Sequence, residues 1–324
     1  MPSGFKGLAV GGVVVAIVAA GGIGWMIGTR SNAAADTTRP FPRVNGKPDF
    51  TGIWQANNEA HWDLQAHSAR AGMVTQQGVY PYEYAQVAAA PVVALGAAAG
   101  VPASIGVVEG DGEIPYKPEA ATIKKENAAH WIDRDPELKC YLPGIPRAMY
   151  MPYPFQITQG GNKIQMAFAF SNAARVIHFD KVAGPPVDTY MGHSVGHWDG
   201  DTLVVDVTDF NGKNWLDRAG NFHSDKLHLV ERFTLKTPDV IRYEVTIEDT
   251  DTFTRPWRIA MPLYRRMEPN MELMEYRCVE FAEEFLFGNL RKRQLVQHWE
   301  GETMNVDITR KVLPGDKLYE WYRR

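Results

Sequence analysis

Hydrophobic and polar residues alternate along the second half of the chain in short runs separated by turn residues. A period of two is typical of strands with one buried face, and these runs follow one another with mostly short connections. Such a series favours an antiparallel meander that closes into a lipocalin-like barrel or forms a strongly curled sheet. The predicted strands are Lys163–Phe170, Arg175–Phe179, His193–Trp198, Thr202–Phe210, Leu227–Lys236, Val240–Asp249, Trp257–Tyr264 and Glu272–Phe281.

The start of the chain has a different pattern, with a long uncharged run at Gly7–Gly28. Lys6 precedes this run and the small residues Ala33–Ala35 follow it, which is typical of an export signal. The run is also long enough to be a membrane anchor. Both interpretations place the rest of the chain outside the cytoplasm, in the periplasm or another extracytoplasmic space. If the segment is not cleaved, residues 7–28 anchor the chain to the inner membrane.

A second uncharged run, Tyr84–Val108, lies further along the first half. Pro91 and Pro102 interrupt it, so a straight spanning helix is not expected. The run can be a packed insertion loop, or an apolar flap over a ligand site or against the membrane. Residues 117–131 read as a solvated helix. The predicted organisation is a signal or anchor at 1–35, a linker at 36–48, and one β-rich domain at 49–324 with a partly helical, loop-rich insertion at 64–131.

The loop Thr237–Asp239 joins two strands whose register can be inferred, because a shift of one residue would turn every side chain to the other face. A three-residue loop places the apolar residues of both strands on one face, with Glu231 among them, and opposite charges on the other face. A four-residue loop would instead place Glu231 opposite Glu244. The predicted pairs are Leu235–Ile241, Phe233–Tyr243, Glu231–Val245, Leu229–Ile247, Arg232–Glu244 and His228–Glu248.

A carboxylate on an apolar face is costly unless a cation or a proton neutralises it. Arg255 shares the parity of Trp257 and Ile259 in the next strand, so we expect it to be the partner of Glu231. The pair can be structural. Alternatively, Glu231 can contact a ligand or transfer a proton.

The sequence Asp199-Gly200 predicts a tight turn at the tip of a second hairpin. A two-residue loop at these positions pairs His193 with Asp206 and His197 with Thr202. One face then carries Gly196, Trp198, Leu203 and Val205, and the histidines lie on the other. A three-residue loop would change the pairing.

Composition and charge exclude several classes of protein for this chain. The net charge of −4, from 34 basic and 38 acidic residues, argues against nucleic acid as a partner. Two cysteines exclude a disulfide-dense scaffold and a four-cysteine metal site. Because an exported chain enters an oxidising compartment, we expect Cys140 and Cys278 to form a disulfide. Two buried free thiols are the alternative.

The densest polar stretch is Trp215–Asp225, in a connection between strands. Asp217, His223 and Asp225 can form an acid–base pair, since a carboxylate orients and charges an imidazole, or they can belong to a structural loop. The histidine spacings match no zinc motif, so we expect no metal, and no motif indicates a cofactor. Gly192–Gly196 matches G-x-S-x-G, but it leads into a hairpin instead of a helix, which favours a plain strand.

Several sequence blocks occur together between about residues 49 and 290. In this combination the chain resembles a family of exported bacterial proteins that are largely known as hypothetical proteins. The resemblance implies export and a β-rich fold, and it assigns no activity. The blocks are Asp135–Arg147, Tyr150–Gln156, Gly196–Asp206, Asp217–Asp225 and Ile247–Trp257.

We therefore expect an exported envelope protein that binds a hydrophobic small molecule in a barrel pocket, because large aromatic side chains with a few polar anchors suit such a pocket. One alternative is an enzyme that uses the same pocket for acid–base chemistry, as an isomerase, hydratase or hydrolase. Another is a structural envelope partner that docks through the apolar flap. The predicted catalytic residues are Asp217, His223, Glu231 and Arg255, and the predicted ligand-binding residues are His197, Trp198, Trp215, Tyr243 and Trp257.

Overall fold

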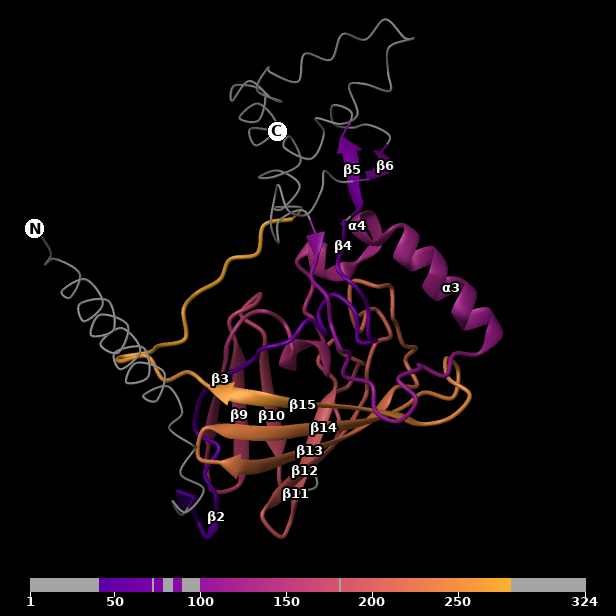
Figure 1. The fold of residues 1–324 in the computed structure, drawn as a ribbon. Coiled ribbons are helices and arrows are strands. Elements are labelled where there is room, and N and C mark those ends of the chain that lie inside the picture. Colours follow the sequence, from indigo (N-terminus) through magenta and orange to yellow (C-terminus); the bar gives the residue numbers. More distant parts are fainter. Residues whose placement is uncertain (1–40, 72, 78–83, 89–99, 181, 281–324) are drawn as a thin grey trace, which may run out of the picture. The chain divides into compact units, whose positions relative to one another are not determined.

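The computed structural model describes residues 41–71, 73–77, 84–88, 100–180 and 182–280. Their main feature is a closed barrel with the strand order β10-β11-β12-β13-β14-β15-β3-β8-β9 (Figure 1), in which β9 also pairs with β10. The strands are β3 (Gly52–Ala56), β8 (Phe155–Gln159), β9 (Lys163–Phe168), β10 (Ala174–His178), β11 (His193–Asp199), β12 (Thr202–Thr208), β13 (His228–Thr237), β14 (Val240–Glu248) and β15 (Trp257–Arg265).

The predicted mainly β fold with a barrel is confirmed. Neighbouring strands are antiparallel, with one exception that the sequence pattern did not indicate. β10 and β11 run parallel, and only Ile177–Ser194 and His178–Val195 are paired. A parallel pair needs a connection that returns the chain to the starting end, and residues 179–192 provide it.

The predicted strand at Glu272–Phe281 is wrong for its described part. Residues 272–275 are not in a strand, and Tyr276 forms only an isolated bridge to Phe170. The reason is topological, because the barrel closes without this segment. β15 already has β14 on one side and β3 on the other, so no edge is left for another strand.

Alternate residues of β13, β14 and β15 point into the barrel and are buried, whereas their neighbours are partly or fully exposed. Burial of each such Leu, Ile or Phe contributes about 1.5–3 kcal/mol to stability. Because nine of these inward residues have 0% exposed surface, the barrel leaves no water-sized space beside them. They are Leu229, Glu231, Phe233, Ile241, Tyr243, Val245, Ile247, Ile259 and Leu263.

The predicted register of the β13–β14 hairpin is confirmed at all six pairs, with Glu231 opposite Val245 and Arg232 opposite Glu244. The tip differs slightly from the prediction. Thr237 pairs with Val240, so the loop is two residues long, and an irregularity between Leu235 and Thr237 absorbs the extra residue. This bulge gives the same register as a three-residue loop.

The predicted pairing of the β11–β12 hairpin is wrong. Asp199 pairs with Thr202 and His193 lies opposite Thr208 instead of Asp206. The turn consists of Gly200 and Asp201, and Gly200 has a φ of 60°. Glycine thus takes the first turn position, as type II′ turns require, and not the second. The partners move by two residues, so each side chain stays on its predicted face.

The insertion leaves and re-enters the domain at neighbouring positions. β4 (Arg70–Ala71) pairs with β7 (Gly100–Val101), and Ala71 lies opposite Gly100. Between them, β5 (Met73–Gln77) pairs with β6 (Tyr84–Ala88), and residues 89–99 lie outside the described residues. After β7 the chain returns to the barrel, where the Ala260 amide donates to the Val107 carbonyl at 3.0 Å.

The predicted helix at 117–131 is confirmed as α3 (Pro118–Ala129), which has Pro118 in its first turn. It leads through α4 (Trp131–Arg134) and the 3-10 turns η2 (Pro136–Lys139) and η3 (Arg147–Met149) to β8. No helix in the described ranges is long and apolar enough to span a membrane. The predicted signal or anchor at 7–28 and the tail after residue 280 lie outside the described residues.

Candidate functional site

Four polar side chains form a buried group inside the barrel. Arg175 of β10 binds both carboxylate oxygens of Glu231 of β13, and the Nη1–Oε1 distance is 3.1 Å. The hydroxyl of Tyr243, from β14, donates to Glu231 Oε1 at 2.7 Å. Arg175 Nε donates to Ser194 Oγ of β11 at 2.8 Å. Each charged or polar head group is therefore bound by another group of the protein itself.

The predicted partner of Glu231 is wrong. Arg255 lies before β15, and its Nη2 pairs with Asp111 Oδ2 at 3.2 Å on the surface. Side chains alternate between the two faces only within a strand. Arg255 lies in the turn before β15, so this alternation does not make it point inward. Arg175 was missed, although a signal was present. It is in phase with Ile177, which is also buried, so an arginine occupied an inward position of a predicted strand.

This arrangement makes Glu231 a poor general acid or base. A bidentate guanidinium and a phenol bind the charged carboxylate, and no proton of the group faces solvent. The pKa of Tyr243 is raised well above its usual range by burial and by the adjacent Glu231, so its hydroxyl stays protonated and keeps donating. The Ser194 hydroxyl is also buried in a strand, which confirms that G-x-S-x-G is a plain strand in this chain.

Asp217 is fully buried in the connection between β12 and β13. Its oxygens accept hydrogen bonds from the amides of Leu64 (2.8 Å) and Ala219 (2.9 Å) and from the Asn221 side chain (2.6 Å). Burial and the nearby Asp63 raise the pKa of Asp217 to about 7, against the opposing effect of the Asn221 and Leu64 bonds. The carboxylate joins two loops, which is a structural role.

His223 is not held by a carboxylate, contrary to the prediction. Its Nδ1 lies 2.7 Å from the carbonyl oxygen of Ser224, and its ring packs edge-on against Phe210. Burial lowers the pKa of His223, so the imidazole is neutral, and Nδ1 is the protonated nitrogen that donates to the carbonyl. The nearby carboxylate, Asp249, binds the amide of Ser224 instead, at 2.6 Å.

The negative charge of Asp249 makes a contribution to stability that experiment can test. Its carboxylate accepts bonds from the Ser224 amide and hydroxyl (2.6 and 2.8 Å) and from the Asp251 and Thr252 amides (3.0 and 3.2 Å). Burial opposes the charged form, but these bonds outweigh it and lower the pKa of Asp249. Because the pKa is lower in the folded state, the stabilisation is present above the ordinary aspartate pKa and is lost as the pH falls.

We therefore expect Asp249→Asn to reduce the free energy of unfolding by about 1–3 kcal/mol at neutral pH. The variant should also lose less stability than the wild type between about pH 5 and pH 2. Urea unfolding at a series of pH values measures both. Asp251→Asn is the matched control, because the Asp251 side chain is exposed. Identical pH profiles for Asp249→Asn and the wild type would contradict the assignment.

The predicted catalytic residues do not bind one another. In the described part of the chain, no hydrogen bond or ion pair joins Asp217, His223, Glu231 and Arg255 to one another. The predicted ligand-binding residues are also dispersed. His197 is exposed on the outer face, Trp198 stacks between Phe50 and Phe179, Trp215 packs with Trp131 and Leu138, Tyr243 binds Glu231, and Trp257 packs on Phe253.

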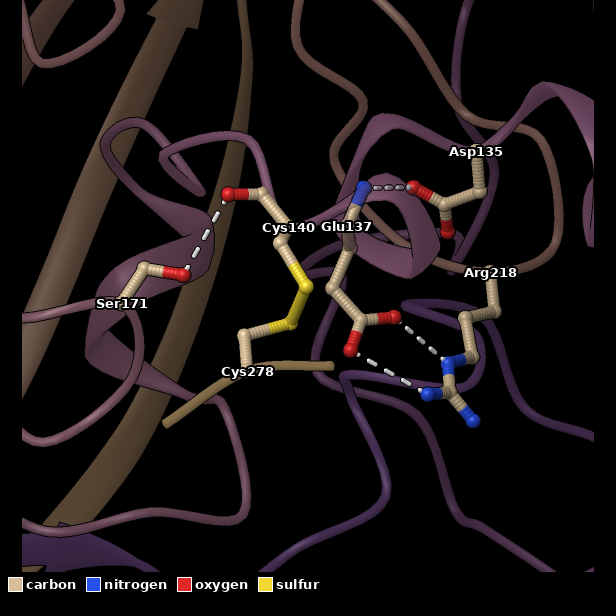
Figure 2. Close-up of a disulfide and its surroundings, with 6 residues drawn as sticks. All are labelled: Asp135, Glu137, Cys140, Ser171, Arg218 and Cys278. Carbon is tan, nitrogen blue, oxygen red and sulfur yellow. Dashed lines mark hydrogen bonds and ion pairs between the residues drawn. A yellow bond between two sulfur atoms is a disulfide. The ribbon is translucent and has the colours of Figure 1, made fainter. Parts of the chain in front are cut away.

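A second buried ionic group, which sequence reasoning missed, connects the segment around η2 to the loops beside the barrel. Arg147 binds both oxygens of Asp135 at 2.7 and 2.8 Å. Arg218 binds both oxygens of Glu137 at 2.9 and 3.2 Å, and Figure 2 shows this pair. His61 Nε2 lies 3.7 Å from Glu137. We call these five residues the ionic cluster.

Electrostatics set the charge states of Glu137 and His61 in the ionic cluster. Burial opposes the charged form of Glu137, but Arg218 and Arg147 outweigh it and lower the pKa of the carboxyl. Burial, together with the same two arginines, holds the pKa of His61 well below its usual range, so His61 is neutral. The cluster joins paired, opposite charges and therefore ties segments together. In the sequence, the cluster was indicated only by the acidic residues and Arg147 of the Asp135–Arg147 block. This block has neither a strand period nor a helix period, so the sequence does not show which of its side chains are buried.

The predicted disulfide is confirmed. Cys140 and Cys278 are bonded, with their Cα atoms 5.5 Å apart, and Figure 2 shows the bond beside Glu137. Among the described residues, no group of three or more His, Cys, Asp or Glu side chains could hold a metal ion. Comparisons with protein-family models, curated proteins and solved structures find no match to this chain. The suspected family resemblance therefore stays a prediction.

Proposed function

We propose that the protein is a non-catalytic, exported envelope protein that binds another envelope protein through residues 72–99, which are part of the predicted insertion at 64–131. The observation that carries the proposal is the stem formed by β4 and β7. Ala71 and Gly100 are paired neighbours, so the segment of 28 residues between them begins and ends at one place. Only one of those residues, Glu83, is charged. A long apolar insertion that the barrel does not need for closure is suited to contact with a partner.

The packing of the barrel supports this alternative over the other two. A hydrophobic ligand in the barrel needs space, and the inward residues around Glu231 have no exposed surface. An acid–base enzyme needs a titratable group that can reach a substrate, and Glu231 and His223 are each engaged by buried partners. Ligand binding in the barrel stays the competing prediction. The disulfide supports export, since disulfides persist in oxidising compartments.

Because β4 and β7 are paired, residues 72–99 can be removed without changing the chain on either side. Replacement of residues 72–99 by Asn-Gly would join Ala71 to Gly100 through a two-residue turn. The replacement spares the chain from Gly100 to Glu109, where Val101 is buried and Val107 and Glu109 pair with β15. We expect the shortened protein to unfold within a few degrees of the wild type.

Native gels of mild-detergent extracts from the cells that produce the protein test the interaction. We expect the wild type to migrate in an assembly larger than one chain and the shortened protein to migrate as one chain. Val187→Asp, on an exposed loop outside the insertion, is the control and should leave the assembly intact. A shortened, folded protein that still migrates in the assembly would refute the proposal.

A further inference from the structure

The chain after β15 forms an exposed arm, residues Met267–Glu280. Met267, Met274 and Val279 have 68%, 69% and 56% of their surface exposed. From residue 269 to residue 275, the hydrogen bonds that the structure describes stay within the arm, as in the bond from the Met271 amide to the Glu268 carbonyl. The described hydrogen bonds therefore do not tie this stretch to the rest of the domain.

The arm is attached to the domain at its far end. Tyr276 forms a bridge with Phe170, and its ring lies 4.3 Å from the ring of Tyr153 and 5.8 Å from that of Phe170. Two residues later, Cys278 is bonded to Cys140. We call Tyr153 and Phe170 the aromatic seat. The aromatic contacts of Tyr276, its backbone bridge to Phe170 and the disulfide thus hold the described end of the arm.

The domain is held together independently of this bond. Cys140 follows η2, whose position is fixed by the Asp135–Arg147 and Glu137–Arg218 pairs of the ionic cluster. The barrel strands close through their own ladders. Figure 2 shows the disulfide beside the Glu137–Arg218 pair, and neither cysteine lies in a barrel strand. Loss of the disulfide should therefore act on the arm and leave the barrel folded.

We infer that the Cys140–Cys278 disulfide is a redox-controlled clasp, whose reduction releases the arm and uncovers the aromatic seat. Both cysteines are partly exposed, so a thiol can approach them. The reaction is thiol–disulfide exchange with a dithiol reductant. One reductant thiolate forms a mixed disulfide and its second thiol resolves it, which leaves Cys140 and Cys278 as thiols and the reductant as a disulfide. This inference does not depend on the insertion or its partner.

Hydrogen exchange of the purified full-length protein, detected by mass spectrometry, tests the clasp. We expect reduction by a small dithiol to increase the exchange rate of the amides from Tyr276 to Glu280 about tenfold or more. Amides in β12 to β15 should be unaffected. The double variant Cys140→Ser/Cys278→Ser should match the reduced protein without any reductant, which separates loss of the bond from side effects of the reagent.

Tyr276→Ala is the matched control in the oxidised protein. Because the disulfide still holds the arm, its exchange there should rise much less than on reduction, and reduction of this variant should give the rate of the reduced wild type. Unchanged exchange of the arm after reduction would overturn the inference, because the aromatic contacts would then suffice. Loss of protection in the barrel strands would also overturn it, because the bond would then stabilise the whole domain.

Discussion

Glu231→Gln should lower the free energy of unfolding by about 3–5 kcal/mol, because it leaves the buried Arg175 without a counter-charge. Arg175 is 4% exposed, so water cannot replace the lost carboxylate. The neutral amide also offers a single acceptor where the carboxylate accepts from Arg175 and Tyr243. Urea unfolding monitored by circular dichroism measures the change.

Two further variants make this prediction specific. Glu244→Gln, on the outer face of the same hairpin, should cost at most about 1 kcal/mol, because its pairs with Arg242 and Arg258 are exposed. The double variant Arg175→Met/Glu231→Leu should recover most of the loss, since both buried charges are removed together. If the double variant were as unstable as Glu231→Gln, the loss would reflect packing and not an unpaired charge.

Arg147→Met should be similarly damaging, with a loss of about 3–5 kcal/mol. Arg147 carries the charge that offsets Asp135, and burial alone would lower its pKa, but Asp135 outweighs burial and raises it. Without the guanidinium, Asp135 is fully buried next to Glu137 with no cation bound to it. Thermal and urea unfolding measure the loss.

The pH dependence of this variant distinguishes charge from packing. In Arg147→Met a buried carboxyl can take up a proton in place of its lost partner, so the deficit relative to the wild type should shrink towards about pH 4. Arg134→Met is the control, because Arg134 pairs with Glu126 on the surface and should contribute less than about 1 kcal/mol. A deficit that does not change with pH would contradict the electrostatic explanation.

Strand parity predicted which side chains of the β13–β14 hairpin enter the barrel, and Glu231 was found there. The alternation along a strand is a local property. It predicts which face of the sheet a side chain lies on, but not which distant residue the side chain contacts. Arg175 is 56 residues from Glu231 in the sequence, and the two meet only because the barrel closes through β10 and β11. The parallel step between those strands depends on a long connection that has no periodic pattern.

The ionic cluster could not be predicted for a related reason. Asp135, Glu137 and Arg147 lie in irregular segments and short turns, where no repeat indicates which side chains are buried. Turn chemistry was only partly informative. Asp199-Gly200 correctly predicted a hairpin. Type I′ and type II′ turns accept glycine at different positions, however, and the wrong position of Gly200 in the turn gave the wrong partner for His193.

We propose that the protein acts through its surface, because the inward side chains themselves fill the barrel. Native mass spectrometry of the purified, disulfide-bonded protein tests this most directly. We predict a single species with the mass of the chain alone, before and after incubation with fatty acids. A hydrophobic molecule that co-purifies with the protein and is lost in Tyr243→Phe would contradict the claim, because it would place a ligand beside Glu231 in the barrel.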